Sequence, residues 1–225
     1  MSTLPFRCVA FDLDGTVADT APDLAMALNH ALAAMDRPQL SLAEVRSLVG
    51  HGTRALLRGG LAATGASDEM MVERGYPILM DYYEQHVCAF TRPYPGVEAA
   101  MDWLAEAGIA LALCTNKPAQ VTRLLVDALG WQGRFAAIVG GDTLTVQKPD
   151  PAPLLLAIDR AGGGPAAFVG DSIVDMQTAH AAGIPGVAVT FGYADRPVEE
   201  LGASATIEHF DDLVGLLRTM KTLRA

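Results

Sequence analysis

The sequence predicts an α/β fold, in which a doubly wound, Rossmann-like parallel sheet forms the core and a small all-helical cap domain is inserted after the first strand. Three observations support this prediction. Short apolar segments recur along the chain, with stretches of helical periodicity between them. Most of these segments are apolar throughout rather than alternating, as in parallel strands that are covered on both faces. Residues 18–91 break this rhythm, because they carry helical periodicity and no convincing strand.

Each strand of the core is predicted from an apolar run that ends in polar or turn residues. The first is CVAF at 8–11, and the later ones are expected at 109–114, 136–140, 166–170 and 186–190, with a weaker candidate at 205–208. Helices are expected between them at 97–107, 118–129, 152–162 and 173–182. Because strands and helices alternate, the core is predicted to be a doubly wound parallel sheet.

The helical insert has a recognisable beginning and end. Thr20 is a candidate N-cap, Pro22 fits a first helical turn, and Asp23 stands at the capping-box position. TRPYPG at 91–96 predicts a return linker, because it holds two prolines and a glycine. Further helices are expected near 41–48, 52–63 and 69–89. The predicted domains are a core of residues 1–17 and 92–225 and a helical cap of residues 18–91.

The composition argues against several classes of protein. The chain has 16 basic and 26 acidic residues, a net charge of −10, and therefore lacks the basic surplus that binds nucleic acid or anionic membranes. Its apolar runs are much shorter than the ~20 residues of a membrane span. The first residues lack the pattern of a signal peptide, and three widely spaced cysteines indicate reduced core thiols. We expect a cytoplasmic monomer or homodimer without nucleic-acid or membrane partners.

Polar residues at the ends of the predicted strands are the candidates for chemistry, because ligands of such sheets bind outside the carboxyl ends of the strands. They are Asp12, Asp14 and Thr16 after the first strand, Thr115 and Asn116 after the second, Lys148 after the third, and Asp171 and Asp175 after the fourth. Two unit charges ~4 Å apart repel by about 4 kcal/mol at an effective dielectric constant near 20. Four clustered carboxylates therefore need a cation, and Mg²⁺ accepts one or two carboxylates together with a substrate phosphate. The histidines are scattered, so zinc is not indicated.

These residues resemble the four motifs of the haloacid dehalogenase-like hydrolase superfamily. The motifs are Asp12-x-Asp14-x-Thr16, a strand-terminal Thr115, Lys148, and Gly-Asp171-Ser-x-x-Asp175, in that order. Within the superfamily, the segments that resemble phosphoglycolate phosphatases are VGHG (49–52), TNKP (115–118), GGDTL (140–144) and KPDP (148–151). The resemblance implies a Mg²⁺-dependent phosphatase that acts on a small phosphorylated metabolite, with 2-phosphoglycolate as the first substrate to test.

The resemblance also implies a role for each motif residue. Asp12 would be the nucleophile that forms an aspartyl-phosphate, and Asp14 would be the general acid and base. Thr115 and Lys148 would hold the phosphoryl oxygens, and Thr16 and Asn116 are candidate substrate contacts. The implied metal ligands are the carboxylates of Asp12 and Asp171 and the backbone carbonyl of Asp14, with support from Asp175.

The predicted cap contributes candidate substrate contacts at Gly50, His51, Gly52 and Arg54. Backbone amides at a helix start and an arginine could hold a small carboxylate. Arg54 and Arg58 are four residues apart, which is equally the spacing of a solvated helix face. Neither interpretation of Arg54 is excluded by the sequence.

Simpler interpretations stay open for other motif residues. Asp171 and Asp175 could stabilise a helix N-terminus, Thr115 could be an N-cap, and Lys148 could be a solvated lysine. We expect Lys117 to cap its turn rather than to bind phosphate. A calcium loop is excluded, because an EF-hand that begins at Asp12 would need glycine at its sixth position and glutamate at its twelfth.

Three other functions compete with the phosphatase. A sugar phosphomutase resembling β-phosphoglucomutase would use the same aspartate pair, and a sugar-phosphate phosphatase or pyrophosphatase would use the same chemistry. A non-enzymatic phospho-acceptor would also gather acids, threonine and lysine at strand ends. The long helical insert and the second aspartate argue against the phospho-acceptor.

Overall fold

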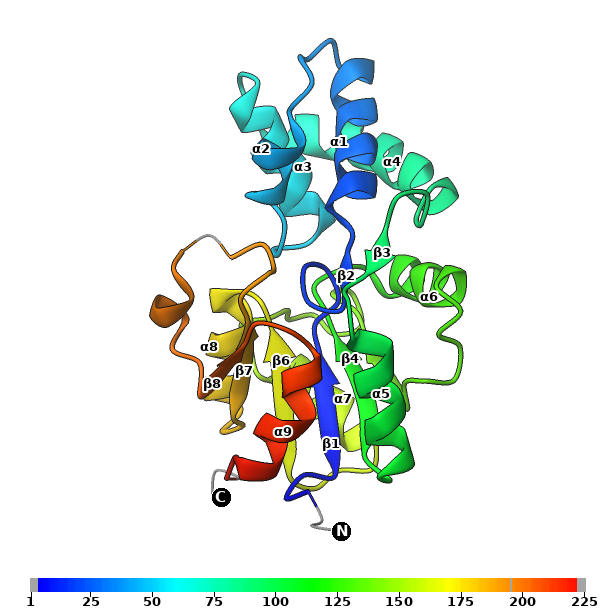
Figure 1. Ribbon diagram of the computed structural model, residues 1–225. Helices are drawn as coiled ribbons and strands as arrows, with labels where there is room; N and C mark the ends of the chain where they lie inside the picture. The colour runs from blue at the N-terminus through cyan, green and yellow to red at the C-terminus, as the bar shows by residue number, and fades with distance from the viewer. Residues whose placement is uncertain (1–3, 195, 222–225) are drawn as a thin grey trace.

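The computed structural model describes residues 4–194 and 196–221, and its core is a six-stranded parallel sheet in the order β5-β4-β1-β6-β7-β8 (Figure 1). The strands are β1 (Cys8–Phe11), β4 (Ala110–Cys114), β5 (Ala137–Val139), β6 (Ala166–Gly170), β7 (Gly186–Val189) and β8 (Ala205–Ile207). The strand order reverses at β1, which pairs with β4 on one side and β6 on the other. This topology confirms the predicted doubly wound sheet, with its ligand crevice at the carboxyl ends of the central strands.

Helices cover both faces of the sheet, as parallel strands require. They are α5 (Val97–Glu106), α6 (Ala119–Ala128), α7 (Ala152–Arg160), α8 (Ile173–Ala181) and α9 (Asp211–Thr219), with a 3₁₀ turn at Val198–Leu201. Val9 and Phe11 of β1 join the cluster that contains α5 and α9, whereas Cys8 and Ala10 join the cluster that contains α7. This alternation follows from the two-residue period of a strand. Helix α9 was not among the helices predicted from the sequence.

Four helices, α1 (Ala21–Ala34), α2 (Leu42–Arg46), α3 (Thr53–Ala63) and α4 (Glu69–Gln85), lie beyond the carboxyl ends of the strands (Figure 1). The chain enters this helical segment through β2 (Ala18–Asp19) and leaves it through β3 (Arg92–Pro93). These two short strands pair with each other in an antiparallel ribbon. The expected return linker thus contains a strand that the sequence did not reveal. The assignment of residues 18–91 to a separate domain stays a prediction.

The beginning of α1 differs from the expected capping box. Thr20 occupies the N-cap position, but its side chain makes no capping hydrogen bond and instead donates to Asp14 Oδ1 at 2.6 Å. The backbone N–H of Thr20 donates to the Tyr193 hydroxyl, so it is not available to Asp23. The buried Asp23 carboxylate accepts hydrogen bonds from the backbone N–H groups of Phe90 and Thr91 and from the Thr91 hydroxyl. Asp23 therefore joins the two ends of the helical segment.

The cysteines are reduced, as their wide spacing in the sequence predicts. Cys8, Cys88 and Cys114 are free thiols, and burial raises the pKa of Cys8 to about 11 and that of Cys114 to about 12. Thiols with such pKa values are poor nucleophiles at neutral pH. In the part of the chain that the structure describes, no helix has both the length and the apolar character needed to cross a membrane.

Candidate active site

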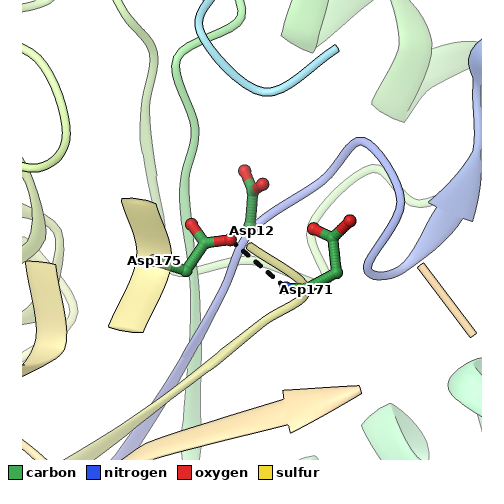
Figure 2. A group of neighbouring side chains, drawn as sticks. All are labelled: Asp12, Asp171 and Asp175. Atoms are coloured by element: carbon green, nitrogen blue, oxygen red, sulfur yellow. Dashed lines mark hydrogen bonds between the residues drawn. The ribbon is translucent and has the colours of Figure 1, made fainter. Parts of the chain in front are cut away.

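Three buried carboxylates meet where β1 and β6 end and α8 begins. Asp12 follows β1, Asp171 follows β6, and Asp175 lies in the first turn of α8, and one oxygen of each lies within 4.8 Å of the others. Figure 2 shows Asp12 between Asp171 and Asp175. The sheet register brings these sequence-distant residues together, because the Asp12 N–H continues the ladder by donating to Val169 O at 2.9 Å. Three of the four carboxylates that the sequence predicts to cluster at the strand ends thus lie together, whereas the fourth, Asp14, pairs with Lys117.

Lys148 supplies the positive charge within this cluster. Its Nζ lies 2.6 Å from Asp175 Oδ1 and 2.9 Å from Asp12 Oδ1, and its side chain is buried. The contact with Asp12 is an ion pair without hydrogen-bond geometry, so Asp12 Oδ1 has no hydrogen-bond partner. Burial alone would lower the pKa of Lys148, but the charges of Asp12 and Asp175 raise it above its ordinary value. Lys148 is therefore a permanent cation in the floor of the site.

The cluster carries more negative than positive charge. Burial raises the pKa of Asp12 from 3.8 to about 6, with Lys148 opposing the shift and Asp175 adding to it. Burial and the charges of Asp175 and Asp12 raise the pKa of Asp171 well above its ordinary value. When all three carboxylates are ionised, the single ammonium of Lys148 leaves two negative charges uncompensated, and this repulsion adds to the rise in their pKa values when no cation is bound. A hard divalent cation with oxygen ligands fits this donor set and would balance it.

Asp171 is held from two sides. Its Oδ1 accepts a hydrogen bond from Thr16 Oγ1 at 3.0 Å, and its Oδ2 accepts one from the Tyr193 backbone N–H at 2.7 Å. Gly15 has a φ of +82°, and a Cβ there would lie 2.4 Å from Asp171 Oδ2, so only glycine fits this position. Thr16, which the sequence suggests as a substrate contact, is fully buried and supports Asp171 instead.

Asp175 stabilises the N-terminus of a helix, one of the interpretations that the sequence left open, and it also pairs with Lys148. Its Oδ2 accepts hydrogen bonds from the backbone N–H groups of Asp171 and Ser172 and from Ser172 Oγ, which completes a capping box at the start of α8. Its Oδ1 pairs with Lys148. Both carboxylate oxygens are therefore engaged by the protein, and Asp175 fixes Lys148 relative to the start of α8.

Asp14 lies next to a lysine whose role the sequence analysis misjudged. Lys117 Nζ donates to Asp14 Oδ1 at 2.8 Å and to Oδ2 at 3.1 Å, and the Thr20 hydroxyl also donates to Oδ1. The Lys117 side chain is fully buried, and its Nζ lies 4.6 Å from the centre of the Tyr83 ring. The expectation that Lys117 caps its turn is wrong. Its position directly after Thr115 and Asn116, at the end of a central strand, was the signal that could have identified it.

Thr115 and Asn116 line the same crevice. Thr115 is not an N-cap, because α6 begins after Pro118, and its hydroxyl accepts from the Lys117 N–H at 3.2 Å. The Asn116 carboxamide donates to the backbone oxygens of Gly50 and Lys148 and accepts from the Lys148 N–H. Asn116, predicted as a substrate contact, therefore uses its carboxamide to connect the lysine loop with the loop before α3.

A cleft of about 340 Å³, counted with its open mouth, separates the strand ends from the helical segment. Asp12, Asp14, Thr115, Asn116 and Lys117 line its floor, and Leu24, Val49, Gly50, Gly52, Thr53 and Leu56 line its roof. The roof contains the glycine loop that the sequence predicts, at the N-terminal end of α3. Two of the predicted cap residues, His51 and Arg54, are not among the lining residues.

Arg54 lies on the surface of the helical segment. Its Nη1 pairs with Glu73 Oε1 at 2.5 Å, and its guanidinium lies 4.2 Å from the centre of the Tyr76 ring. His51 is exposed in the loop. The solvated-face interpretation of Arg54 thus describes this structure, because α3 directs Arg54 and Arg58 toward the acidic residues of α4.

The fold and the site together place a buried carboxylate cluster at the carboxyl end of the central strands of a doubly wound sheet, which is the arrangement of the haloacid dehalogenase-like motifs. The family model for haloacid dehalogenase-like hydrolases matches residues 9–189. The chain therefore belongs to the haloacid dehalogenase-like hydrolase family. This result confirms the resemblance drawn from the four motifs.

Relatives with assigned names match over nearly the whole chain. A phosphoglycolate phosphatase from Mesorhizobium japonicum is 47% identical over 208 residues, which are 91% of this chain and 92% of that protein. A phosphoglycolate phosphatase from Caulobacter vibrioides is 41% identical over 217 residues, 95% of this chain and 92% of that protein. Among solved structures, a predicted phosphoglycolate phosphatase from Haemophilus somnus superposes with a TM-score of 0.89 at 30% identity, covering 94% of this chain and 98% of that one.

Proposed function

We propose that this protein is a Mg²⁺-dependent phosphatase that hydrolyses 2-phosphoglycolate to glycolate and phosphate. The names of its relatives support this substrate. The observation that carries the proposal is the cleft itself, in which Asp12 and Asp14 face a small roof of apolar side chains and glycine backbone. Such a cleft suits a short phosphate monoester better than a large polar ligand.

The metal would be held by the carboxylates of Asp12 and Asp171 and by the backbone carbonyl of Asp14, with Asp175 in support. The fit rests on the uncompensated charge of the cluster and on Asp12 Oδ1, which is buried without a hydrogen-bond partner. When bound, Mg²⁺ would neutralise the carboxylates and stabilise the negative charge of the transferring phosphoryl group. The bound ion would thus allow Asp12 to approach a phosphate dianion.

Asp12 attacks phosphorus, and the new Asp12 oxygen–phosphorus bond forms as the bond to the substrate alkoxide oxygen breaks. Lys148 and Thr115 hold the phosphoryl oxygens in line during the transfer. Asp14 gives its proton to the departing alkoxide, which leaves as glycolate. Asp14 then takes a proton from water as the water oxygen attacks phosphorus, and Asp12 is released as a free carboxylate with phosphate as the product.

The carboxylate of 2-phosphoglycolate would bind at the start of α3. This helix begins after Gly50-His51-Gly52, has no side-chain cap, and carries no acidic residue in its first turn. Its free N–H groups and dipole therefore favour a small anion. Gly50, Gly52 and Thr53 line the roof there. We further propose that residues 18–91 act as a cap domain that closes over the substrate and excludes water.

A phosphate-release assay with Mg²⁺ tests this function. The expected order of kcat/KM has 2-phosphoglycolate well above glucose 6-phosphate and pyrophosphate, with no conversion of β-glucose 1-phosphate to glucose 6-phosphate. Asp12→Asn and addition of EDTA should each abolish phosphate release, while the exposed Asp127→Asn should have no effect. Full activity of Asp12→Asn would contradict the mechanism. Preference for a sugar phosphate or for pyrophosphate, or formation of glucose 6-phosphate, would show that 2-phosphoglycolate is the wrong substrate. The aspartyl-phosphate mechanism would still stand.

A further inference from the structure

Tyr193, in the loop after β7, contacts both the carboxylate cluster and the chain segment that leads into the helical segment. Its backbone N–H donates to Asp171 Oδ2 at 2.7 Å. Its ring extends toward β2 and the start of α1, and a Cβ on Gly15 would lie 2.7 Å from its Cδ2. One residue therefore packs against the loop that carries Asp14 while it holds Asp171.

The Tyr193 hydroxyl uses all of its hydrogen-bonding capacity at the linker. It accepts from the backbone N–H groups of Thr20 at 2.7 Å and Ala21 at 2.9 Å, and it donates to Asp19 Oδ1 at 2.6 Å. A hydroxyl has one donor and two acceptor positions, so no capacity remains. The first N–H groups of a helix have no partner within the helix. Here the Tyr193 side chain, from the loop after β7, accepts two hydrogen bonds at the start of α1. The linker conformation thus depends on this hydroxyl.

A second contact continues from the linker to the acid. Thr20, whose N–H is bound by Tyr193, donates its own hydroxyl to Asp14 Oδ1 at 2.6 Å. Asp19, the third partner of the Tyr193 hydroxyl, pairs with Arg46 of α2 at 2.6 Å. The hydrogen bonds therefore run from Asp171 through Tyr193 and Thr20 to Asp14, and they branch to the helical segment.

We propose that Tyr193 is a positioning residue, which sets Asp14 relative to Asp171 by fixing the linker between the sheet and the helical segment. This inference rests on the proposed function, because it takes Asp14 as the general acid. Tyr193 needs no contact with substrate in this role. Its backbone N–H binds Asp171 of the carboxylate cluster, and its hydroxyl binds the linker. A single substitution of the side chain therefore separates the two contributions.

Tyr193→Phe removes the hydroxyl and keeps both the ring and the backbone N–H that Asp171 uses. The variant should therefore keep its Mg²⁺ affinity, measured as the Mg²⁺ concentration at half-maximal thermal stabilisation, within threefold of the wild type. Its kcat for 2-phosphoglycolate should fall about tenfold or more, with KM changed less than threefold, because the acid is misplaced. In single-turnover measurements, the rate of leaving-group release should fall about tenfold or more for 2-phosphoglycolate but at most threefold for p-nitrophenyl phosphate, because nitrophenolate departs without protonation. Single turnover separates this step from hydrolysis of the aspartyl-phosphate, in which Asp14 serves as the base for both substrates.

Hydrogen exchange supplies a readout that does not depend on activity. In Tyr193→Phe with Mg²⁺, the amides of Thr20 and Ala21 should exchange at least tenfold faster, whereas amides of β1 and β6 should not change. Tyr82→Phe is the matched control, because Tyr82 lies on α4 and stacks between His30 and His86, away from the linker. This control should leave both exchange and kcat unchanged.

The outcomes separate the two claims. Equal losses in the single-turnover rate of leaving-group release on the two substrates, or unchanged exchange at Thr20 and Ala21, would overturn the role of Tyr193. If the wild type hydrolyses another alkyl phosphate in place of 2-phosphoglycolate, the proposed substrate fails, and the comparison with p-nitrophenyl phosphate is made on that alkyl phosphate. Unequal losses with faster exchange would then still establish the positioning role.

Discussion

Replacing Asp12, the proposed nucleophile, with asparagine should stabilise the metal-free protein while it abolishes catalysis. Asp12 is 5% exposed and carries a charge that burial and Asp175 disfavour. Asparagine has nearly the same shape and removes that charge. An unfavourable charge at this position is expected where a carboxylate binds a cation and attacks phosphorus.

The magnitude follows from the shift in the Asp12 pKa from 3.8 to about 6. A raised carboxyl pKa means that the folded protein prefers the protonated form, so its stabilising contribution is complete below pH 3.8 and is lost as the pH rises through 6. At 1.36 kcal/mol per pKa unit, the loss is about 3 kcal/mol above pH 7. This value is an upper limit for the variant, because Lys148 loses one of its two carboxylate partners.

The pH dependence is the sharper part of this prediction. At pH 5 most of the folded protein still has Asp12 protonated, so only part of the penalty has appeared. The difference in free energy of unfolding between Asp12→Asn and the wild type should therefore grow by about 1 kcal/mol from pH 5 to pH 8 and then level off. Urea unfolding in EDTA at several pH values measures this difference.

Magnesium should reverse the order of stability. Saturating Mg²⁺ stabilises a folded state that binds it, and the wild type should gain more than Asp12→Asn. Asp127→Asn, on the exposed face of α6, is the matched control and should show no pH-dependent difference from the wild type. An Asp12→Asn protein that is less stable than the wild type at pH 8 in EDTA, or a difference that does not vary with pH, would refute the electrostatic account of the cluster.

Three further predictions concern residues around the cluster. Lys148→Met should abolish phosphate release. It should also lower the free energy of unfolding of the metal-free protein at pH 8 by about 3–5 kcal/mol, because it leaves buried carboxylates unpaired. Urea unfolding measures this loss, and an unchanged midpoint would contradict the prediction. Thr16→Val should weaken Mg²⁺ binding about tenfold in calorimetry, because Asp171 Oδ1 loses its donor, and unchanged affinity would argue against that support. Arg54→Ala should leave KM within twofold, because Glu73 and Tyr76 hold the guanidinium on the surface. A large rise in KM would show that Arg54 turns inward when substrate binds.

The part of the site that lies at strand ends could be predicted from the sequence. Asp12, Thr115, Lys148 and Asp171 each follow an apolar run or its connecting loop, and the register of a parallel sheet then brings them together. Their residue types predicted a divalent-cation site, because clustered carboxylates with a single ammonium need a cation to balance their charge. Five of the six strands of the sheet were predictable because each is a short apolar segment, whereas β8 was a weaker candidate because an exposed threonine interrupts it.

The contacts between distant loops could not be predicted. Whether Thr20 caps α1 or bonds Asp14 depends on Tyr193, which takes the backbone N–H that a capping box would need. The sequence contains no periodicity that relates these positions. Lys117 and Arg54 were misjudged or left open, because the direction of a long side chain is set by its neighbours in space. The Lys117 ammonium lies over the Tyr83 ring, and the Arg54 guanidinium forms an ion pair with Glu73.

The central claim is that Asp12 forms a covalent bond to phosphorus, and trapping that intermediate tests it most directly. The protein with Mg²⁺ is mixed with 2-phosphoglycolate, quenched during turnover, and reduced with borohydride, which converts an aspartyl-phosphate to homoserine. Peptide mass spectrometry should then find homoserine at position 12 and nowhere else, and Asp12→Asn should yield none. Rapid phosphate release without modification at position 12, or with modification at another residue, would contradict the account.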